Sequence, residues 1–360
     1  MMLIALFSLL MMLIAFFLLK GFSKDSSVAT EYSAAEYREQ CPQIEENIIN
    51  DGHQGTLAHE EWIKGAVLVD EEVLAKTVQQ WTSNPCVFLD GKERLQTLRG
   101  GNYQVFSGLG TEDSWVTVQQ RVELIRKKYP REAFSALLEA EYWVSYAWYA
   151  RGDRFSSSVT PEGWKLFHER LERAEGILRD SKSYASVLPG WYQSAITVLS
   201  ALGKKAERDE VFIEGASRFK TYVPIFTVMG YFSLPRWGGS WKAVDAIARW
   251  PLEKLNSSEG YQMYAKIYES VNTDLGRSEV LFRDTKADWP TIKRGFDKMT
   301  EQYSSSKWLL NGYAYMACMA DDAETYRSIR KKLGEDFQTH AWRYPYSPEV
   351  CDSKYSLTEK

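Results

Sequence analysis

The stretch Leu234–Ser240 reads Leu-Pro-Arg-Trp-Gly-Gly-Ser and separates two helical patterns. Pro235 and the two glycines interrupt a helix, and Ser240 is suited to cap the N-terminus of the next one. A rigid turn between two helices predicts a corner in an all-α fold.

Apolar residues recur at helical spacing on both sides of this corner. Trp164, Phe167, Leu171, Ala174 and Leu178 follow one another at steps of three and four, which places them on one helix face. The same spacing recurs through most of residues 111–335, and it predicts consecutive amphipathic helices.

These helices are expected to come in pairs with a regular period. Pro189 and Pro224 begin two such pairs 35 residues apart, and Gly260 begins another 36 residues further on. A helix-turn-helix period near 34 residues is typical of tetratricopeptide-like arrays, in which each pair buries its apolar face against its neighbours. The sequence therefore predicts an all-α fold, a right-handed array of antiparallel helix pairs forming an α-solenoid.

The chain divides into four expected regions. Residues 1–19 form a transmembrane anchor or signal segment, 20–110 a tether and an irregular, mostly helical N-terminal region, 111–335 the helical-repeat domain, and 336–360 a loose C-terminal tail. The tail has two prolines and no periodicity.

Met1–Leu19 is apolar except for Ser8 and would span about 28 Å as a helix, close to the thickness of a bilayer core. A signal peptide is the alternative, but the basic region that should open one is absent. We expect an uncleaved single-pass anchor in a bacterial cytoplasmic (inner) membrane. Lys20 and Lys24 after the segment favour a cytoplasmic body, yet many bacterial proteins with one such segment export the domain behind it, so the side stays open.

The four cysteines, Cys41, Cys86, Cys318 and Cys351, contain no C-x-x-C pair and permit three pairings. Cys318 lies in an apolar helical run, where a buried free thiol is the ordinary expectation. The redox compartment stays open.

The composition excludes some classes of function. A net charge of -4 argues against a general nucleic-acid binder, which usually carries a basic stripe. Aromatic residues make up 14% of the chain, and they indicate either a core of large rings or a groove for sugars or peptides. The four histidines have no metal-ligand spacing, and neither a phosphate-binding loop nor a nucleophile elbow occurs, so no metal, cofactor or catalytic residue is expected.

An enzyme is the alternative interpretation. Glu139, Glu141 and Asp153 lie near a helix rich in Trp and Tyr. Glycoside hydrolysis needs two carboxylates that flank a cleft, so these residues suggest a carbohydrate-active enzyme with an aromatic-lined cleft between helices.

The corner itself admits two interpretations. In the structural one, Trp237 fills a gap between helix pairs and Arg236 bonds carbonyls at the preceding helix end. In the functional one, glycine N–H groups and the Arg236 guanidinium bind a carboxylate or phosphate. The Arg151 turn and the Trp191-Tyr192 pair admit the same alternatives. The candidate partner-binding residues are Arg151, Trp191, Tyr192, Arg236, Trp237, Gly238 and Gly239.

Four ordered segments carry a resemblance. They are Tyr146–Gly152, Glu162–Phe167, Leu188–Tyr192 and Leu234–Ser240. Together they resemble an uncharacterised bacterial family of tetratricopeptide-like helical-repeat proteins, a domain of unknown function marked by this corner. The resemblance implies a helical array over about two-thirds of the chain and supplies no activity. We therefore expect a membrane-anchored binding or scaffolding protein that recognises a peptide or protein partner.

Overall fold

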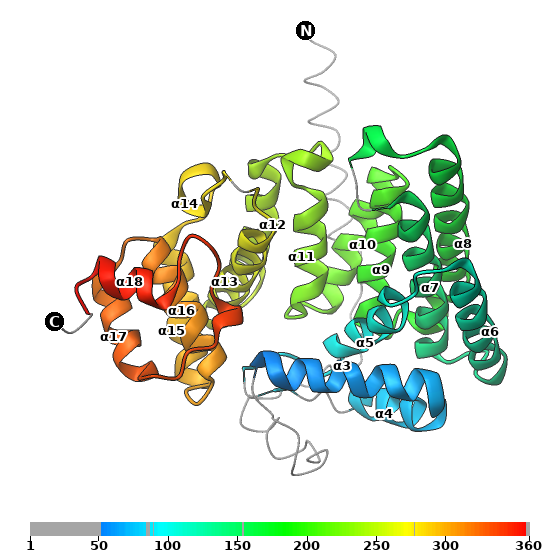
Figure 1. Ribbon diagram of the computed structural model, residues 1–360, viewed down its shortest axis with the longest axis horizontal. Helices are drawn as coiled ribbons and strands as arrows, with labels where there is room; N and C mark the ends of the chain where they lie inside the picture. The colour runs from blue at the N-terminus through cyan, green and yellow to red at the C-terminus, as the bar shows by residue number, and fades with distance from the viewer. Residues whose placement is uncertain (1–51, 84–86, 89, 153–154, 277, 358–360) are drawn as a thin grey trace, which may run out of the picture. The chain divides into compact units, whose positions relative to one another are not determined.

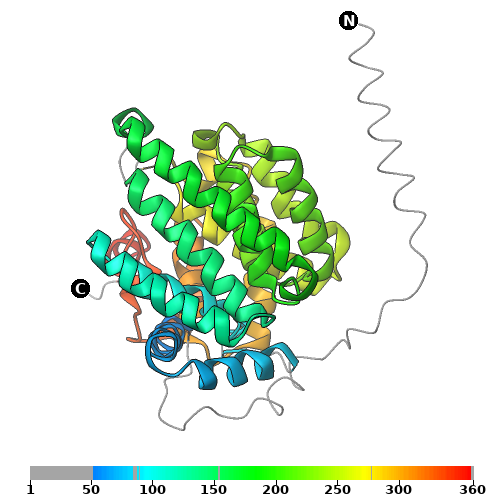
Figure 2. The same cartoon turned by 90° about the vertical axis from the view of Figure 1, so that its right-hand side faces the viewer.

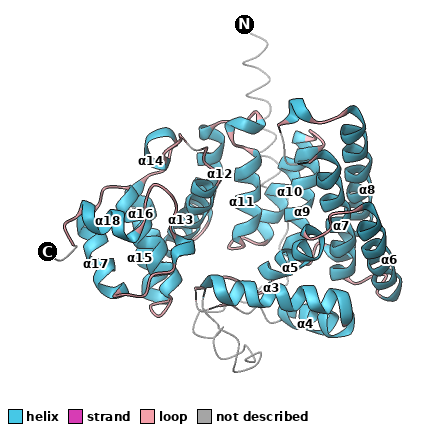
Figure 3. Cartoon of the chain, in the orientation of Figure 1, coloured by secondary structure: helices cyan, strands magenta, loops and turns pink. Residues whose placement is uncertain are grey.

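The computed structural model describes residues 52–83, 87–88, 90–152, 155–276 and 278–357. Among these residues the chain is helical and contains no strand (Figure 3). The α-helices, labelled in Figure 1, are α3 Gly52–Val69, α4 Glu71–Ser83, α5 Gln96–Ser107, α6 Glu112–Lys128, α7 Ala133–Arg151, α8 Pro161–Ala185, α9 Pro189–Ala201, α10 Lys205–Arg218, α11 Val223–Phe232, α12 Trp241–Lys254, α13 Ser257–Thr273, α14 Leu281–Asp284, α15 Trp289–Gln302, α16 Lys307–Met319, α17 Ala323–Leu333 and α18 Pro348–Lys354. Three short 3-10 helices are η1 Ser156–Ser158, η2 Pro235–Trp237 and η3 Thr339–Ala341.

The helices begin where capping residues predict them. Thr160 accepts a hydrogen bond from the N–H of Gly163 at 3.0 Å, and Pro161 occupies the first helical position of α8. Ser240 accepts from the N–H of Ala243 at 3.2 Å and begins α12.

The helices pack as successive pairs along the chain. The pairs are α7 with α8, α9 with α10, α11 with α12, α13 with α15, and α16 with α17. The first helices of the pairs also pack on one another, α7 on α9, α9 on α11 and α11 on α13. Three of them begin at Pro189, Val223 and Ser257, so the pairs recur every 34 residues. Figure 2 shows α6, α7 and α8, coloured teal to green, lying side by side. The helical-repeat character expected from the sequence is thus present.

Large rings fill the core between the pairs. Tyr192, Tyr264, Tyr268 and Tyr313 each expose 1% of their surface or less. Burial of such rings supplies a large share of the apolar stabilisation of a fold. The interpretation of the aromatic excess as core is therefore confirmed for these rings.

The helices α3 and α5 pack against each other and then onto the repeat. Gly101 lies inside α5, where a Cβ would sit 2.5 Å from the Cβ of Ile63 in α3, so the glycine allows the two backbones to approach. The helix α5 therefore continues through Gly100 and Gly101 to Ser107. In turn α5 packs on α7 and α9, and α3 packs on α16.

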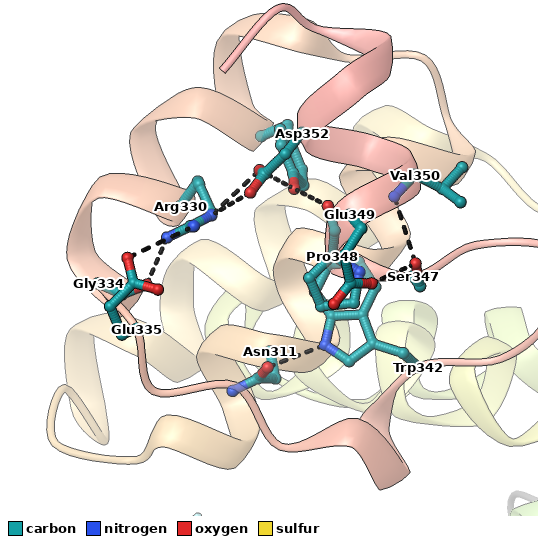
Figure 4. A network of polar contacts seen from close by, with 11 residues as sticks. Asn311, Arg330, Gly334, Glu335, Trp342, Ser347, Pro348, Glu349, Val350 and Asp352 are labelled. Atoms are coloured by element: carbon teal, nitrogen blue, oxygen red, sulfur yellow. Dashed lines mark hydrogen bonds and ion pairs between the residues drawn. The ribbon is translucent and has the colours of Figure 1, made fainter. Parts of the chain in front are cut away.

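The segment after Gly334 is ordered, which corrects the expectation of a loose tail as far as Leu357; residues 358–360 lie outside the described part. Trp342 is buried and donates from Nε1 to Asn311 Oδ1 at 2.9 Å, and Arg330 pairs with Asp352 at 3.0 Å (Figure 4). These contacts attach η3 and α18 to the last helix pair.

A disulfide also joins Cys318 in α16 to Cys351 in α18. The expectation of a free thiol at Cys318 is wrong, because the segment assumed to be loose brings a second sulfur to it. Cys41 and Cys86 lie outside the described residues.

The predicted membrane span at residues 1–19 also lies outside the described residues. None of the described helices is both long enough and apolar enough to span a bilayer.

Candidate functional site

The backbone of the corner is occupied by its own hydrogen bonds. The N–H groups of Gly238, Gly239 and Ser240 each donate to a backbone carbonyl of residues 233–235, at 2.9, 3.2 and 2.9 Å. Gly238 has a φ of 75°, which favours glycine. Because all three N–H groups have partners, they are not available to bind an anion as the functional interpretation requires.

Both side chains of the corner, Arg236 and Trp237, also contact other groups of the chain. Arg236 donates from Nη1 to the carbonyl oxygen of Asp274 at 2.6 Å and lies 4.9 Å from the centre of the Tyr231 ring. Asp274 is the C-cap of α13, the second helix after the corner, so the expected bond to the preceding helix end is wrong. Trp237 packs on Tyr231 and Phe232 at 5.6 and 5.7 Å between ring centres. The geometry favours the structural interpretation of the corner.

The remaining candidate residues lie among other rings. The Arg151 guanidinium lies 5.3 Å from the centre of the Trp148 ring and 5.6 Å from that of Trp164. Trp191 is 3% exposed and donates to a backbone carbonyl of α8, and Tyr192 is fully buried. Neither of these two rings offers a surface to a partner, and the structure does not bring them together with the corner.

The carboxylates of the enzyme interpretation point to different neighbours. Glu139 bonds Arg126 of α6 at 3.1 Å, whereas Glu141 pairs with Arg99 of α5 at 3.2 Å. The two residues are two positions apart on α7, which places them on different sides of the helix. Burial raises the pKa of both carboxyl groups, against the lowering effect of the arginines. Asp153 lies outside the described residues, and the other two do not flank a common cleft.

Two cavities lie between the N-terminal helices and the first helices of the pairs. The α7 cavity, of about 460 Å³, is lined by residues from α3, α5, α7, α9 and α11. The α13 cavity, of about 280 Å³, is lined by residues from α13, α16, η3 and the loop before α5. Lys92 and Gln96 line both cavities, so the turn and first residue of α5 form a shared wall.

The α7 cavity is polar, and two of the charged groups in its lining form an ion pair. Arg99 forms the ion pair described above with Oε1 of Glu141, and Ser194 donates to the same oxygen at 2.9 Å. Asn102 of α5 donates to the other carboxylate oxygen, Oε2, at 2.8 Å. Tyr103 lines the cavity and is 64% exposed. This cavity is therefore open to solvent along α5, with hydrogen-bonding groups set into its wall.

The α13 cavity holds charges without direct partners. Lys266 and Glu269 stand one turn apart on α13, and Glu93 lies near Lys266. Among the described residues, no hydrogen bond or ion pair within 4.0 Å engages the side chain of any of these three. Asp90 and Arg343 add one charge of each sign to the lining. Both signs therefore line one cavity, set too far apart to pair.

Burial shifts the titration of these groups toward their neutral forms. It raises the pKa of Glu269 and of Glu93 to about 7, although Lys266 opposes the shift. It lowers the pKa of Lys266, although Asp90, Glu269 and Glu93 oppose that shift. Clustered shifts of this kind in a cavity mark a candidate functional site.

Sequence reasoning missed the α13 cavity. One signal was present, since Lys266 and Glu269 interrupt the apolar run Met263–Tyr268 and its continuation in α13. Charged residues on the buried face of a helix are expected to have oppositely charged or hydrogen-bonding partners, because burial of an unpaired charge is costly. Arg343 in the cavity lining and Glu93 near Lys266 carried no comparable signal, because they come from distant parts of the chain.

Among the described residues, no three His, Cys, Asp or Glu side chains are placed to hold a metal ion. Comparison of the chain with family models, with curated proteins and with solved structures gives no match.

Proposed function

We propose that the chain is a helical-repeat binding or scaffolding protein that recognises a peptide or protein partner. In this proposal its helix pairs form a right-handed tetratricopeptide-like α-solenoid behind an N-terminal transmembrane helix at residues 1–19. The 34-residue recurrence of the pairs supports the repeat class, because such arrays present the first helices of successive pairs as a continuous surface.

The α7 cavity is the surface at which we propose that the partner binds. The α7 cavity opens along α5, with exposed Tyr103 at its edge and polar groups of α7 and α9 in its wall. Because α3 and α5 already pack against the first helices, the space left suits an extended segment of a partner better than a whole domain. An exposed aromatic ring beside hydrogen-bonding groups is a frequent element of such interfaces.

The disulfide supports a location for the body. Stable disulfides form in oxidising compartments and are rare in the cytosol. The Cys318–Cys351 bridge therefore favours a body on the outer side of the membrane, against the weak preference of Lys20 and Lys24. A C-terminal alkaline phosphatase fusion should be active in cells, and a fluorescent protein fused there in its place should stay dark. The reverse pattern contradicts this placement.

Photo-crosslinking in the full-length, membrane-bound chain tests partner recognition. Tyr103 is replaced by p-benzoylphenylalanine, and Ile213, which is 59% exposed on α10, is replaced in a matched control. We expect a discrete protein adduct from position 103 and none from position 213. Ser145→Trp, which fills the α7 cavity, should abolish that adduct while circular dichroism stays unchanged.

Two results contradict the proposal. One is the same adduct from both positions, which indicates random collision. The other is an adduct that survives the filled cavity, which places the partner elsewhere on the chain.

A further inference from the structure

The α13 cavity contains charged side chains that no contact among the described residues compensates. Lys266 and Glu269 lie in a wall where desolvation is costly, and neither has a direct partner among the described side chains. A structural ion pair would bring the two groups into contact, as happens for Arg99 and Glu141 in the neighbouring cavity. The charges of the α13 cavity are instead held apart.

The signs of these charges limit what can fit between them. The lining offers Lys92, Lys266 and Arg343 as cations, and Asp90 and Glu269 as carboxylates. An anion alone would meet the carboxylates, and a cation alone would meet the ammonium and guanidinium groups. A ligand that carries both signs can satisfy both sets.

The remaining lining residues and the volume of the cavity also favour a small ligand that carries both charges. Trp308, Leu309 and Val223 give the cavity an apolar part. Its volume of about 280 Å³ is just below the range of pockets for drug-sized ligands and suits a smaller molecule. A sugar could reach the polar groups, but its hydroxyls leave full charges uncompensated. Opposite full charges offset desolvation much better.

We propose that the α13 cavity binds a small zwitterion, a free α-amino acid or a dipeptide with unmodified ends. The ligand carboxylate lies toward Lys266 and Arg343, its ammonium group toward Glu269 and Asp90, and its side chain toward Trp308 and Leu309. The observations behind this inference are those of the α13 cavity and do not depend on the proposed partner recognition at the α7 cavity.

The test is equilibrium dialysis of the full-length chain in detergent, read by mass spectrometry. The probes are an equimolar mixture of the twenty free amino acids, a randomised dipeptide pool, the same compounds with N-acetyl and C-amide blocks, and a pool of disaccharides. We expect retention of at least one unmodified zwitterion and no retention of its blocked counterpart.

Three variants locate the site. Lys266→Met and Glu269→Gln each remove one charge from the cavity and should lower the affinity for the retained zwitterion roughly tenfold or more. Lys165→Met, at an exposed position of α8, should leave that affinity unchanged. Removing a charge that has no direct partner should not destabilise the fold, which thermal unfolding checks. If Lys266→Met does not fold, Arg343→Gln tests the cationic side.

Several results would overturn the proposal. They are retention of no zwitterion, equal retention of blocked and unmodified compounds, and retention that both cavity variants leave unchanged. Retention of disaccharides that depends on Lys266 and Glu269 would assign the cavity to sugars.

Discussion

Gly239 has no room for a side chain. A Cβ there would sit 2.5 Å from the carbonyl carbon of Ser233 and closer still to its oxygen, both backbone atoms. We expect Gly239→Ala to lower the free energy of unfolding by about 2–3 kcal/mol, because the corner must open to admit the methyl group. Gly230 in α11 is the matched control, since nothing lies within 4 Å of a Cβ there. Gly230→Ala should be neutral or stabilise by up to about 1 kcal/mol. Urea unfolding of both variants measures the difference, and equal effects would contradict the account of the corner.

Glu269 should give stability an unusual dependence on pH. Its carboxyl group has a pKa of about 7 in the folded chain and 4.5 ordinarily, in surroundings that include Lys266, Asp90 and Arg343. Between these two pH values the folded chain binds more protons than the unfolded chain, so the contribution of Glu269 to stability falls as pH rises. Glu269→Gln removes that loss.

The stability of Glu269→Gln relative to the wild type should therefore increase from pH 4.5 to pH 7, by on the order of 2–3 kcal/mol, and then level off. Urea unfolding at four pH values measures it. His59 provides a contrast of opposite sign, because burial lowers its pKa from 6.5 to about 4, and its contribution to stability is lost as pH falls through that range. A difference between variant and wild type that stays flat with pH would contradict the prediction for Glu269.

At the scale of elements, α18 depends on one covalent link and a few polar contacts. The Cys318–Cys351 bridge closes a loop with a sequence separation of 33 residues. We expect Cys351→Ser to cost about 3 kcal/mol of stability, mainly because the unfolded chain gains freedom. The variant should also expose the segment around Arg343 to trypsin, as limited proteolysis with mass spectrometry would show. Dithiothreitol should reproduce the effect in the wild type and add nothing in the variant. Resistance of the variant to trypsin would show that the packing of Trp342 suffices.

The helices of the repeat were predictable because their signals are local. Thr160-Pro161 and Ser240 mark helix starts through hydrogen bonds within four residues, and apolar spacing gives each helix its buried face. The tail was misjudged because its stability comes from contacts with α16 and α17, which no local pattern of residues 336–357 reveals.

The candidate sites were harder to predict for the same reason. Trp191 and Tyr192 look suited to binding as an exposed pair, but exposure depends on which helix packs over them, and here α8 and α10 do. The α13 cavity is formed by residues of α13, the C-terminal segment and the loop before α5, which are far apart in the sequence. The spacing of residues within each segment does not predict that these segments lie together.

At the scale of the whole described body, the N-terminal helices connect the two ends of the repeat. The Tyr303 ring lies against Gly91, α3 packs on α16, and α5 packs on α7. We expect Tyr303→Ala to speed hydrogen exchange in α3 and in α16 together, because it removes a contact between the end of α15 and the turn before α5 that supports the packing of the N-terminal helices on the last helix pairs. Tyr344→Ala is the control, since that ring is 98% exposed. Faster exchange confined to α15 would show that the two ends are stable independently.

The wall that Lys92 and Gln96 provide has a thermodynamic consequence. A ligand that binds in one of the two cavities and reorients the Lys92 side chain changes the binding free energy of a ligand in the other cavity. Linkage makes that change reciprocal, so each occupant must alter the affinity of the other by the same factor. The affinity for a ligand in one cavity would then depend on whether the other cavity is occupied. The coupling would act through the Lys92 side chain and would not require the helix pairs to move.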